Sequence, residues 1–512
     1  MLSQIKLNRQ GVKAIALDLL PPFLLILLVV LDIPFGRTFE FDNDEGINLM
    51  KAFLYWKGIP LYTETWNDQP PLLTFILSLW FNIVGSSVVA SRVLILLFSI
   101  LLVGSFYQII KDKLGRFSAF FGSLFLILSW SYAKLSVSVM IGLPSLALAM
   151  VSIYILTLYQ RHHHKFLLIL SGCLLALSLQ VKLFTVFLVP LVVVLLLSSQ
   201  FSEANSSQRE PILSPHSIIT KIVLWLSSLI LTYFVLGFLF NSINYDQLWQ
   251  SHLDNSIKDQ YDSTNGVPYL LSLVRNDLDL VRLGAIGVIS IVFKRRWADL
   301  FPLAWLLTAA LLLFNHRPIW YHHYLLLSIP MAWLSAYGVA IVVEFFQQAA
   351  WRDWIKSLEL QKIAIPAVAM ILFAFSVVLI PAKIASPWGR PSSQWEIVEI
   401  LKQHRDRTQW VFSDRPMIPF YAALPIPPEV AVLSNKRLAS GNFTLDNLLE
   451  VLQAYRPEQI VLARRTQEIK SHRGIYRFLR QNYTRTYARA YSSEDPSAIA
   501  EHYLIKTLPP KA

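Results

Sequence analysis

The chain has 512 residues, of which 54% are hydrophobic and only 15% are charged, and its mean hydropathy is +0.48. A soluble protein of this length could not bury so much apolar surface, so the composition excludes a soluble enzyme, a disordered chain and a repeat scaffold. Lys and Arg outnumber Asp and Glu by 45 to 33, a net charge of +12, but the basic residues lie between apolar runs. Membrane topology and anionic lipid explain that placement better than nucleic acid does, and we expect no nucleic-acid partner.

Apolar runs recur along the first three quarters of the chain. A membrane span needs roughly 20 such residues, and about eleven runs qualify, some of them short. They cover residues 15–33, 88–110, 117–133, 142–160, 166–180, 182–199, 218–240, 279–293, 298–314, 319–345 and 363–382. The pattern predicts a mainly α-helical, multi-pass membrane protein whose first span resembles a signal-anchor, because basic residues precede it and no small-residue cleavage site follows.

The basic loops predict the orientation. With the N-terminus in the cytoplasm, the Lys- and Arg-containing loops near 111–116, 161–165, 294–296 and 352–362 all lie inside, as Lys6, Arg9 and Lys13 do. A crossing by the short apolar segment 70–85 would move every later basic loop outside, so we expect that segment to be an interfacial helix. We therefore predict a protein of the plasma or inner membrane.

The last part of the chain changes character. Residues 385–512 are polar and of mixed charge, with strand-like stretches at 408–414 and 457–465 and a helix-like stretch at 445–455. This alternation is typical of a small α/β unit. We predict a transmembrane domain over 1–384 and a soluble extracytoplasmic domain over 385–512.

The first predicted outside loop, residues 34–87, concentrates acidic residues. Four carboxylates lie within six residues just after the first span, and another precedes a double proline: Glu40, Asp42, Asp44, Glu45 and Asp68. Between them, residues 46–58 have the apolar spacing of an interfacial helix. A charge run is usually just a solvated loop. Carboxylates at a lipid surface, however, are disfavoured without a partner or a task, so their position favours an active site.

These residues carry a resemblance to a known family. Asp44-Glu45-Gly46, followed by a helix and then Asp68-Gln69-Pro70-Pro71, resembles the motifs of the polyprenyl-phosphate-dependent glycosyltransferases of the GT-C superfamily. The most similar group is family 39, which contains the protein O-mannosyltransferases and the aminoarabinose transferases of lipid A. The layout of spans, large first loop and soluble tail is also similar, and residues 413–444 look like the tails of bacterial members.

The resemblance implies an integral membrane glycosyltransferase, a hexosyl- or pentosyltransferase. It would move a sugar from a polyprenyl-phosphate donor to a lipid, glycan or protein acceptor on the outer face. It implies that Asp44 is the general base or orients the acceptor, with Glu45 as a weaker candidate. It also implies that Asp68 helps to hold a divalent metal, the one candidate cofactor. The aminoarabinose transferases have Lys where this chain has Gln69, a candidate substrate contact, so another basic residue must recognise the donor phosphate.

A second polar cluster, residues 314–330, begins the tenth predicted span at its outer end. Arg317, His322 and His323 are candidate ligands of the donor phosphate, because Arg binds phosphate through two parallel hydrogen bonds and His can share a proton. His316 is a candidate metal ligand. An interfacial belt of aromatic and cationic residues would give the same pattern, and both interpretations stay open. Lys182 is a further phosphate candidate, although a lysine that snorkels to the interface explains it better.

Direct attack by an acceptor hydroxyl would invert the anomeric carbon, with Asp44 taking the proton. A flippase or transporter of lipid-linked sugars is the alternative function, and it would be expected to have polar residues along a path through its spans. A polysaccharide polymerase or ligase would share the lipid donor. A purely structural membrane protein would leave the acid-rich loop unexplained.

Overall fold

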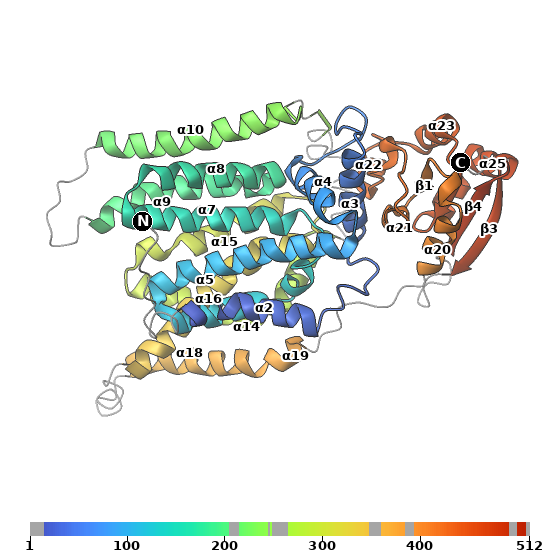
Figure 1. Ribbon diagram of the computed structural model, residues 1–512. Coiled ribbons are helices and arrows are strands. Elements are labelled where there is room, and N and C mark those ends of the chain that lie inside the picture. Colours follow the sequence, from blue (N-terminus) through green and yellow to red (C-terminus); the bar gives the residue numbers. More distant parts are fainter. Residues whose placement is uncertain are drawn as a thin grey trace, which may run out of the picture.

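The computed structural model describes residues 15–203, 215–243, 246–247, 265–347, 360–384, 394–490 and 499–507. Long helices run side by side in a bundle, and a smaller part built around a β-sheet lies beyond one end of it (Figure 1). The basic residues Lys6, Arg9, Lys13, Arg352 and Lys356 lie outside the described residues. So do residues 385–393, just after the predicted domain boundary, and that boundary stays a prediction.

Every predicted apolar run overlaps a helix of the bundle. These helices are α2 (Leu20–Leu31), α5 (Val88–Ile127), α7 (Gly142–His162), α8 (Lys165–Val181), α9 (Leu188–Glu203), α10 (Pro215–Leu239), α14 (Leu278–Phe293), α15 (Phe301–Asn315), α16 (Leu325–Gln347) and α18 (Leu360–Val378). Among the described residues, five helices are long and apolar enough to cross a membrane. The structure thus supports a multi-pass membrane protein, while the number of spans stays a prediction.

Helix α5 contains a sharp turn. Gly115 has a φ of 82°, a backbone conformation that favours glycine. A Cβ built at Gly122 would lie 3.5 Å from Cδ1 of Ile110. In a straight helix, Ile110 and Gly122 would be separated by about 18 Å along the axis, given the rise of about 1.5 Å per residue. The chain therefore folds back at Gly115, between the two apolar runs predicted at 88–110 and 117–133.

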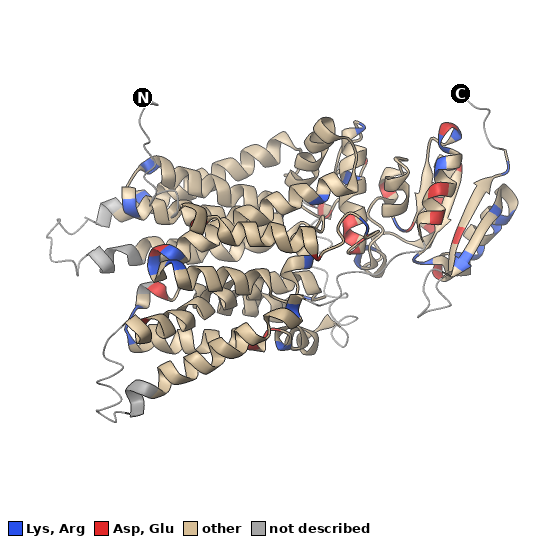
Figure 2. Ribbon diagram, turned by 60° about the horizontal axis from the view of Figure 1, so that its bottom comes forward, with Lys and Arg blue, Asp and Glu red and all other residues tan. Residues whose placement is uncertain are grey.

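Many Lys and Arg residues of the bundle lie at its end remote from the sheet (Figure 2). They form ion pairs between loops and helix ends: Lys111 with Asp18, Lys113 with Asp299, Arg161 with Asp112 and Lys294 with Glu344. The helices between the two ends carry few charges. This grouping agrees with the prediction that the basic loops share one side of the membrane, and which side that is stays a prediction.

Two helices of the first loop, α3 (Asn43–Trp56) and α4 (Leu72–Val84), pack together at the opposite end of the bundle (Figure 1). The Asp42 side chain starts α3 by accepting a hydrogen bond from the Asp44 amide at 2.9 Å. The helices predicted at 46–58 and 70–85 are thus present. Short helices complete this end and the connections: α6 (Tyr132–Leu135), η1 (Leu183–Phe187), α13 (Val267–Arg275), η2 (Trp297–Asp299), η3 (Tyr321–Tyr324) and α19 (Ile380–Ile384).

The C-terminal part, residues 394–507, contains a four-stranded sheet of order β1-β2-β4-β3. Strand β1 (Val411–Ser413) is parallel to β2 (Gln459–Leu462), whereas β4 (Ile499–Ile505) is antiparallel to β2 and to β3 (Tyr483–Ala490). The predicted strands and helix correspond to β1, β2 and α23. The helices are α20 (Trp395–Gln403), η4 (Arg405–Arg407), α21 (Met417–Tyr421), η5 (Pro428–Val430), α22 (Asn435–Ala439), α23 (Leu445–Tyr455), α24 (Thr466–Ser471) and α25 (Arg473–Asn482).

The C-terminal part packs directly on the first loop. Phe420 of α21 lies 5.9 Å from the rings of both Phe53 and Phe81, which belong to α3 and α4. A Cβ added to Gly46 would come within 2.7 Å of the Met417 backbone nitrogen, so this approach requires glycine. The contact is extensive enough that residues of α21 share one buried hydrophobic core with the helical bundle.

Candidate functional site

A cavity of about 250 Å³ lies where the first loop, the end of the bundle and the C-terminal part meet. Each of the three contributes polar or charged side chains to its wall. From the first loop come Asp42, Asp44, Asn48, Lys51, Asp68 and Gln69; from the bundle, Lys182, His316, Trp320, Tyr321, His322 and His323; from the C-terminal part, Ser434, Asn435, Lys436 and Arg464. Residues far apart in the sequence therefore form one polar site.

Asp44 faces this cavity from the first turn of α3, where the positive end of the helix dipole favours a negative charge. Burial raises the pKa of Asp44 to about 7, and the neighbouring carboxylate of Asp42 pushes it in the same direction. The positive charges of Arg464 and Lys182 oppose that rise. A carboxyl group with this pKa can take up and release a proton near neutral pH, as a general base must.

The Asp68 segment is held in place by hydrogen bonds from the first loop. Lys51 Nζ donates to Oδ1 of Asn67 at 3.0 Å, and Nδ2 of Asn67 donates to the Gln69 carbonyl at 2.7 Å. The Tyr62 hydroxyl donates to the same carbonyl at 2.7 Å. Backbone that is tied down on both sides of Asp68 presents its side chain to the cavity in a defined position, opposite the start of α3.

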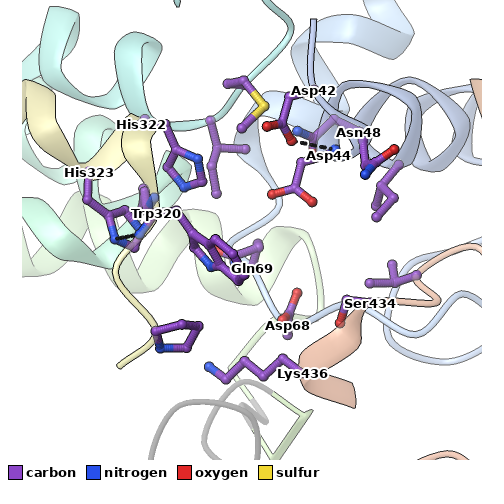
Figure 3. Close-up of a pocket in the computed structure, with 18 of the residues that line it drawn as sticks. Asp42, Asp44, Asn48, Asp68, Gln69, Trp320, His322, His323, Ser434 and Lys436 are labelled. Atoms are coloured by element: carbon purple, nitrogen blue, oxygen red, sulfur yellow. Dashed lines mark hydrogen bonds between the residues drawn. The ribbon is translucent and has the colours of Figure 1, made fainter. Parts of the chain in front are cut away.

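An aromatic cluster holds the cationic and imidazole groups of the bundle. The Lys182 ammonium lies 4.6 Å from the centre of the Phe184 ring. The rings of His316 and His323 lie 4.8 and 5.0 Å from that same ring. His322 lies across the cavity from the carboxylate of Asp44 (Figure 3). The structure therefore brings together Asp44, Asp68, Gln69, Lys182, His316, His322 and His323, all of which are candidates from the sequence.

Glu45, the weaker catalytic candidate, does not line the cavity. Its carboxylate forms a two-point ion pair with Arg92, with Nε to Oε1 at 2.9 Å and Nη2 to Oε2 at 2.8 Å, and both side chains are completely buried. The backbone amides of Phe41 and Val139 donate to the same carboxylate. This geometry makes Glu45 an anchor for the start of α3.

Arg317, a predicted phosphate ligand, is likewise absent from the cavity lining. One of its guanidinium nitrogens donates to the carbonyls of Leu313, Phe314 and His316 at 3.2, 3.1 and 2.8 Å. These carbonyls belong to the C-terminal end of α15, where a positive charge is favourable. The Arg317 side chain thus caps a helix.

Two cavity cations of the C-terminal part, Lys436 and Arg464, are absent from the sequence-based candidates, as is Lys51 of α3. Both belong to the C-terminal part, and only its packing on the first loop brings them to the site. The one signal for Lys436 was its place in residues 413–444, the segment that looks like the tails of bacterial family members. No motif pointed to Arg464.

The residues present do not form a ready metal site. Within the described ranges, no three side chains of His, Cys, Asp or Glu converge as a set of metal ligands. Asp68 and His316 line the same cavity, but they belong to no such set of three among the described residues.

Comparison with known proteins gives a family match over part of the chain and similar folds among solved structures. Residues 68–226 match the dolichyl-phosphate-mannose-protein mannosyltransferase family. No curated protein sequence matches the chain. The structure resembles ArnT from Cupriavidus metallidurans bound to undecaprenyl phosphate, with a TM-score of 0.57 and 12% identity over 98% of this chain and 100% of that one.

A second similar structure is the oligosaccharyltransferase of Archaeoglobus fulgidus, with a TM-score of 0.54 and 11% identity over 87% of this chain and 69% of that one. One structure of that enzyme is a complex with Zn and sulfate (TM-score 0.52, 11% identity, 93% of this chain and 72% of that one). At such low identities these likenesses show the fold. The family match over residues 68–226 and this likeness in fold agree with the resemblance that the motifs of the first loop predicted.

Proposed function

We propose that the protein transfers a sugar from a polyprenyl-phosphate donor to the hydroxyl group of an acceptor at the membrane surface. The observation that carries this proposal is the cavity itself, in which a carboxyl group with a pKa of about 7 faces several cations. A polyprenyl-phosphate sugar is already activated, so the reaction needs no nucleotide. The lipid tail keeps the donor in the bilayer, and the head group must be met where the bundle ends.

Asp44 is the general base of this mechanism. The acceptor oxygen attacks the anomeric carbon, and its proton passes to the Asp44 carboxylate. The bond between the anomeric carbon and the phosphate oxygen breaks, and its electron pair stays on the phosphate. Direct displacement of this kind inverts the anomeric carbon. Asp68, on the facing segment, orients the acceptor or the sugar.

The leaving phosphate gains negative charge as that bond breaks. Cations that already point to its position stabilise this charge without rearranging. Lys182 lines the cavity and takes this role in place of Arg317, whose guanidinium caps α15. His322 and His323 remain candidate contacts of the phosphate or the sugar, because both line the same wall.

The test uses the purified protein in lipid vesicles with radiolabelled polyprenyl-phosphate sugars and crude membrane lipid and glycan as acceptors. Wild type should release polyprenyl phosphate and move the label to a new product. Asp44→Asn should lose roughly 100- to 10,000-fold in rate, the usual contribution of a general base. The matched control is Asp446→Asn, because Asp446 is 82% exposed and does not line the cavity.

Wild-type rates from Asp44→Asn would overturn the assignment of the base. Movement of labelled lipid across the bilayer without any release of polyprenyl phosphate would overturn the transferase and favour the flippase. The polar cavity between the first loop, the bundle and the C-terminal part would then be a gate for the transported lipid.

A further inference from the structure

The C-terminal part contributes a lysine to the cavity at a particular point. Helix α22 begins after Ser434, whose side chain accepts a hydrogen bond from the Arg437 amide. Lys436, in the first turn of α22, lines the cavity together with Asp68 and Gln69. Figure 3 shows the Lys436 side chain extending past Asp68 into the cavity. Gln69 has no charge, so Lys436 is a cation that the C-terminal part contributes to the same wall as this acidic segment.

Lys436 lines the same cavity as Lys182, which comes from the bundle. The two lysines therefore reach one cavity from opposite parts of the fold, and its wall also holds the carboxylates of Asp44 and Asp68. Two like charges that face one cavity are unfavourable by themselves, and an anion between them removes the repulsion and gains a charge-assisted hydrogen bond from each. A phosphate group has the charge and the acceptor oxygens to fill that position.

The segment that carries Lys436 is fixed to the acidic loop. The Arg437 guanidinium lies 4.2 Å from the ring centre of Trp66 and 4.6 Å from that of Phe443. It also donates to the Glu429 carbonyl at 2.6 Å. Trp66 stands two residues before Asp68, so this stack sets the distance between Lys436 and the acidic wall. The position of Lys436 is therefore built into the fold.

We propose that Lys436 and Lys182 together bind the phosphate of the polyprenyl-phosphate donor, so that the C-terminal part forms one wall of the donor site. This inference rests on the proposed transferase function and extends it. It assigns the C-terminal part a direct contact with substrate. Lys436 would also provide the positive charge for the donor phosphate that the uncharged Gln69 cannot provide.

The experiment measures two quantities on the full chain in detergent micelles. One is the KM for the polyprenyl-phosphate sugar. The other is the affinity for unglycosylated polyprenyl phosphate, which reports binding without chemistry. Lys436→Gln should raise the KM and weaken that affinity by roughly 10- to 100-fold, the range for loss of a hydrogen bond to a charged group. Lys436→Arg keeps the charge and should recover most of both.

Lys402→Gln is the matched control, since Lys402 lies in the same part of the chain and pairs with Glu399 at the surface. It should bind the lipid as wild type does. Unchanged affinity and KM in Lys436→Gln would overturn the assignment of Lys436. So would a rise in the KM of the acceptor alone, or wild-type binding of inorganic phosphate as tight as that of the lipid. A wild-type protein that neither binds polyprenyl phosphate nor turns over a polyprenyl-phosphate sugar would instead refute the proposed function.

Discussion

Replacing Glu45 with glutamine should unfold this protein more readily, whereas replacing its neighbour Asp44 with asparagine should not. The Glu45 carboxylate and the Arg92 guanidinium are both 0% exposed. The carboxylate also accepts hydrogen bonds from the amides of Phe41 and Val139, at 3.0 and 3.2 Å. A neutral side chain at this position leaves the guanidinium buried without a counter-charge.

The size of the effect follows from that burial. Removing one partner of a buried ion pair costs about 3–5 kcal/mol in the free energy of unfolding. The double variant Glu45→Leu/Arg92→Met should recover only part of this loss. The reason is that Arg92 also donates to the carbonyls of Phe35 and Thr38, and methionine leaves those acceptors without their donor.

Equilibrium unfolding of the purified protein in mixed micelles measures the free energy, and the vesicle assay measures the rate. Glu399→Gln is the matched control, because the Glu399 side chain is 64% exposed and its loss should change stability by less than about 1 kcal/mol. This reasoning would be refuted if Glu45→Gln were as stable as wild type but as inactive as Asp44→Asn. Such a result would make Glu45 a catalytic group despite its burial.

Three further outcomes are expected. The kcat/KM should rise with pH and level off above about 7, because Asp44 must be ionised to act as a base, and a profile flat from pH 5.5 to 8 would contradict this. Because folding raises the pKa of Asp44 from 3.8 to about 7, the free energy of unfolding of wild type should fall as pH rises through that interval. Asparagine does not ionise, so Asp44→Asn should become more stable relative to wild type over the same interval, as measured by equilibrium unfolding at each pH. Gly46→Ala should lower the free energy of unfolding by about 1–3 kcal/mol, since its Cβ would meet Met417, whereas Gly104→Ala, with no atom closer than 4.0 Å, should not.

The sequence alone was sufficient for features that depend on local pattern. Apolar runs predicted the helices of the bundle, because a span must be apolar over its whole length whatever it packs against. The acidic segment predicted the candidate site because its carboxylates are brought together by local structure. Asp42 starts α3 and Asp44 stands in its first turn, so the helix itself brings the two carboxylates together. The short strand β1 and helix α23 were also visible from their own composition.

Only the tertiary structure decided which of the candidates reach the cavity. Consecutive residues on a helix point about 100° apart, so Asp44 and Glu45 cannot face the same way, and the packing of Arg92 selects which one turns inward. Lys436 joins the site through contacts with a loop hundreds of residues away, and no local pattern records such a contact. The acids and Lys182 could therefore be predicted from the sequence, but the contributions of Lys436 and Arg464 depended on how the C-terminal part packs on the first loop.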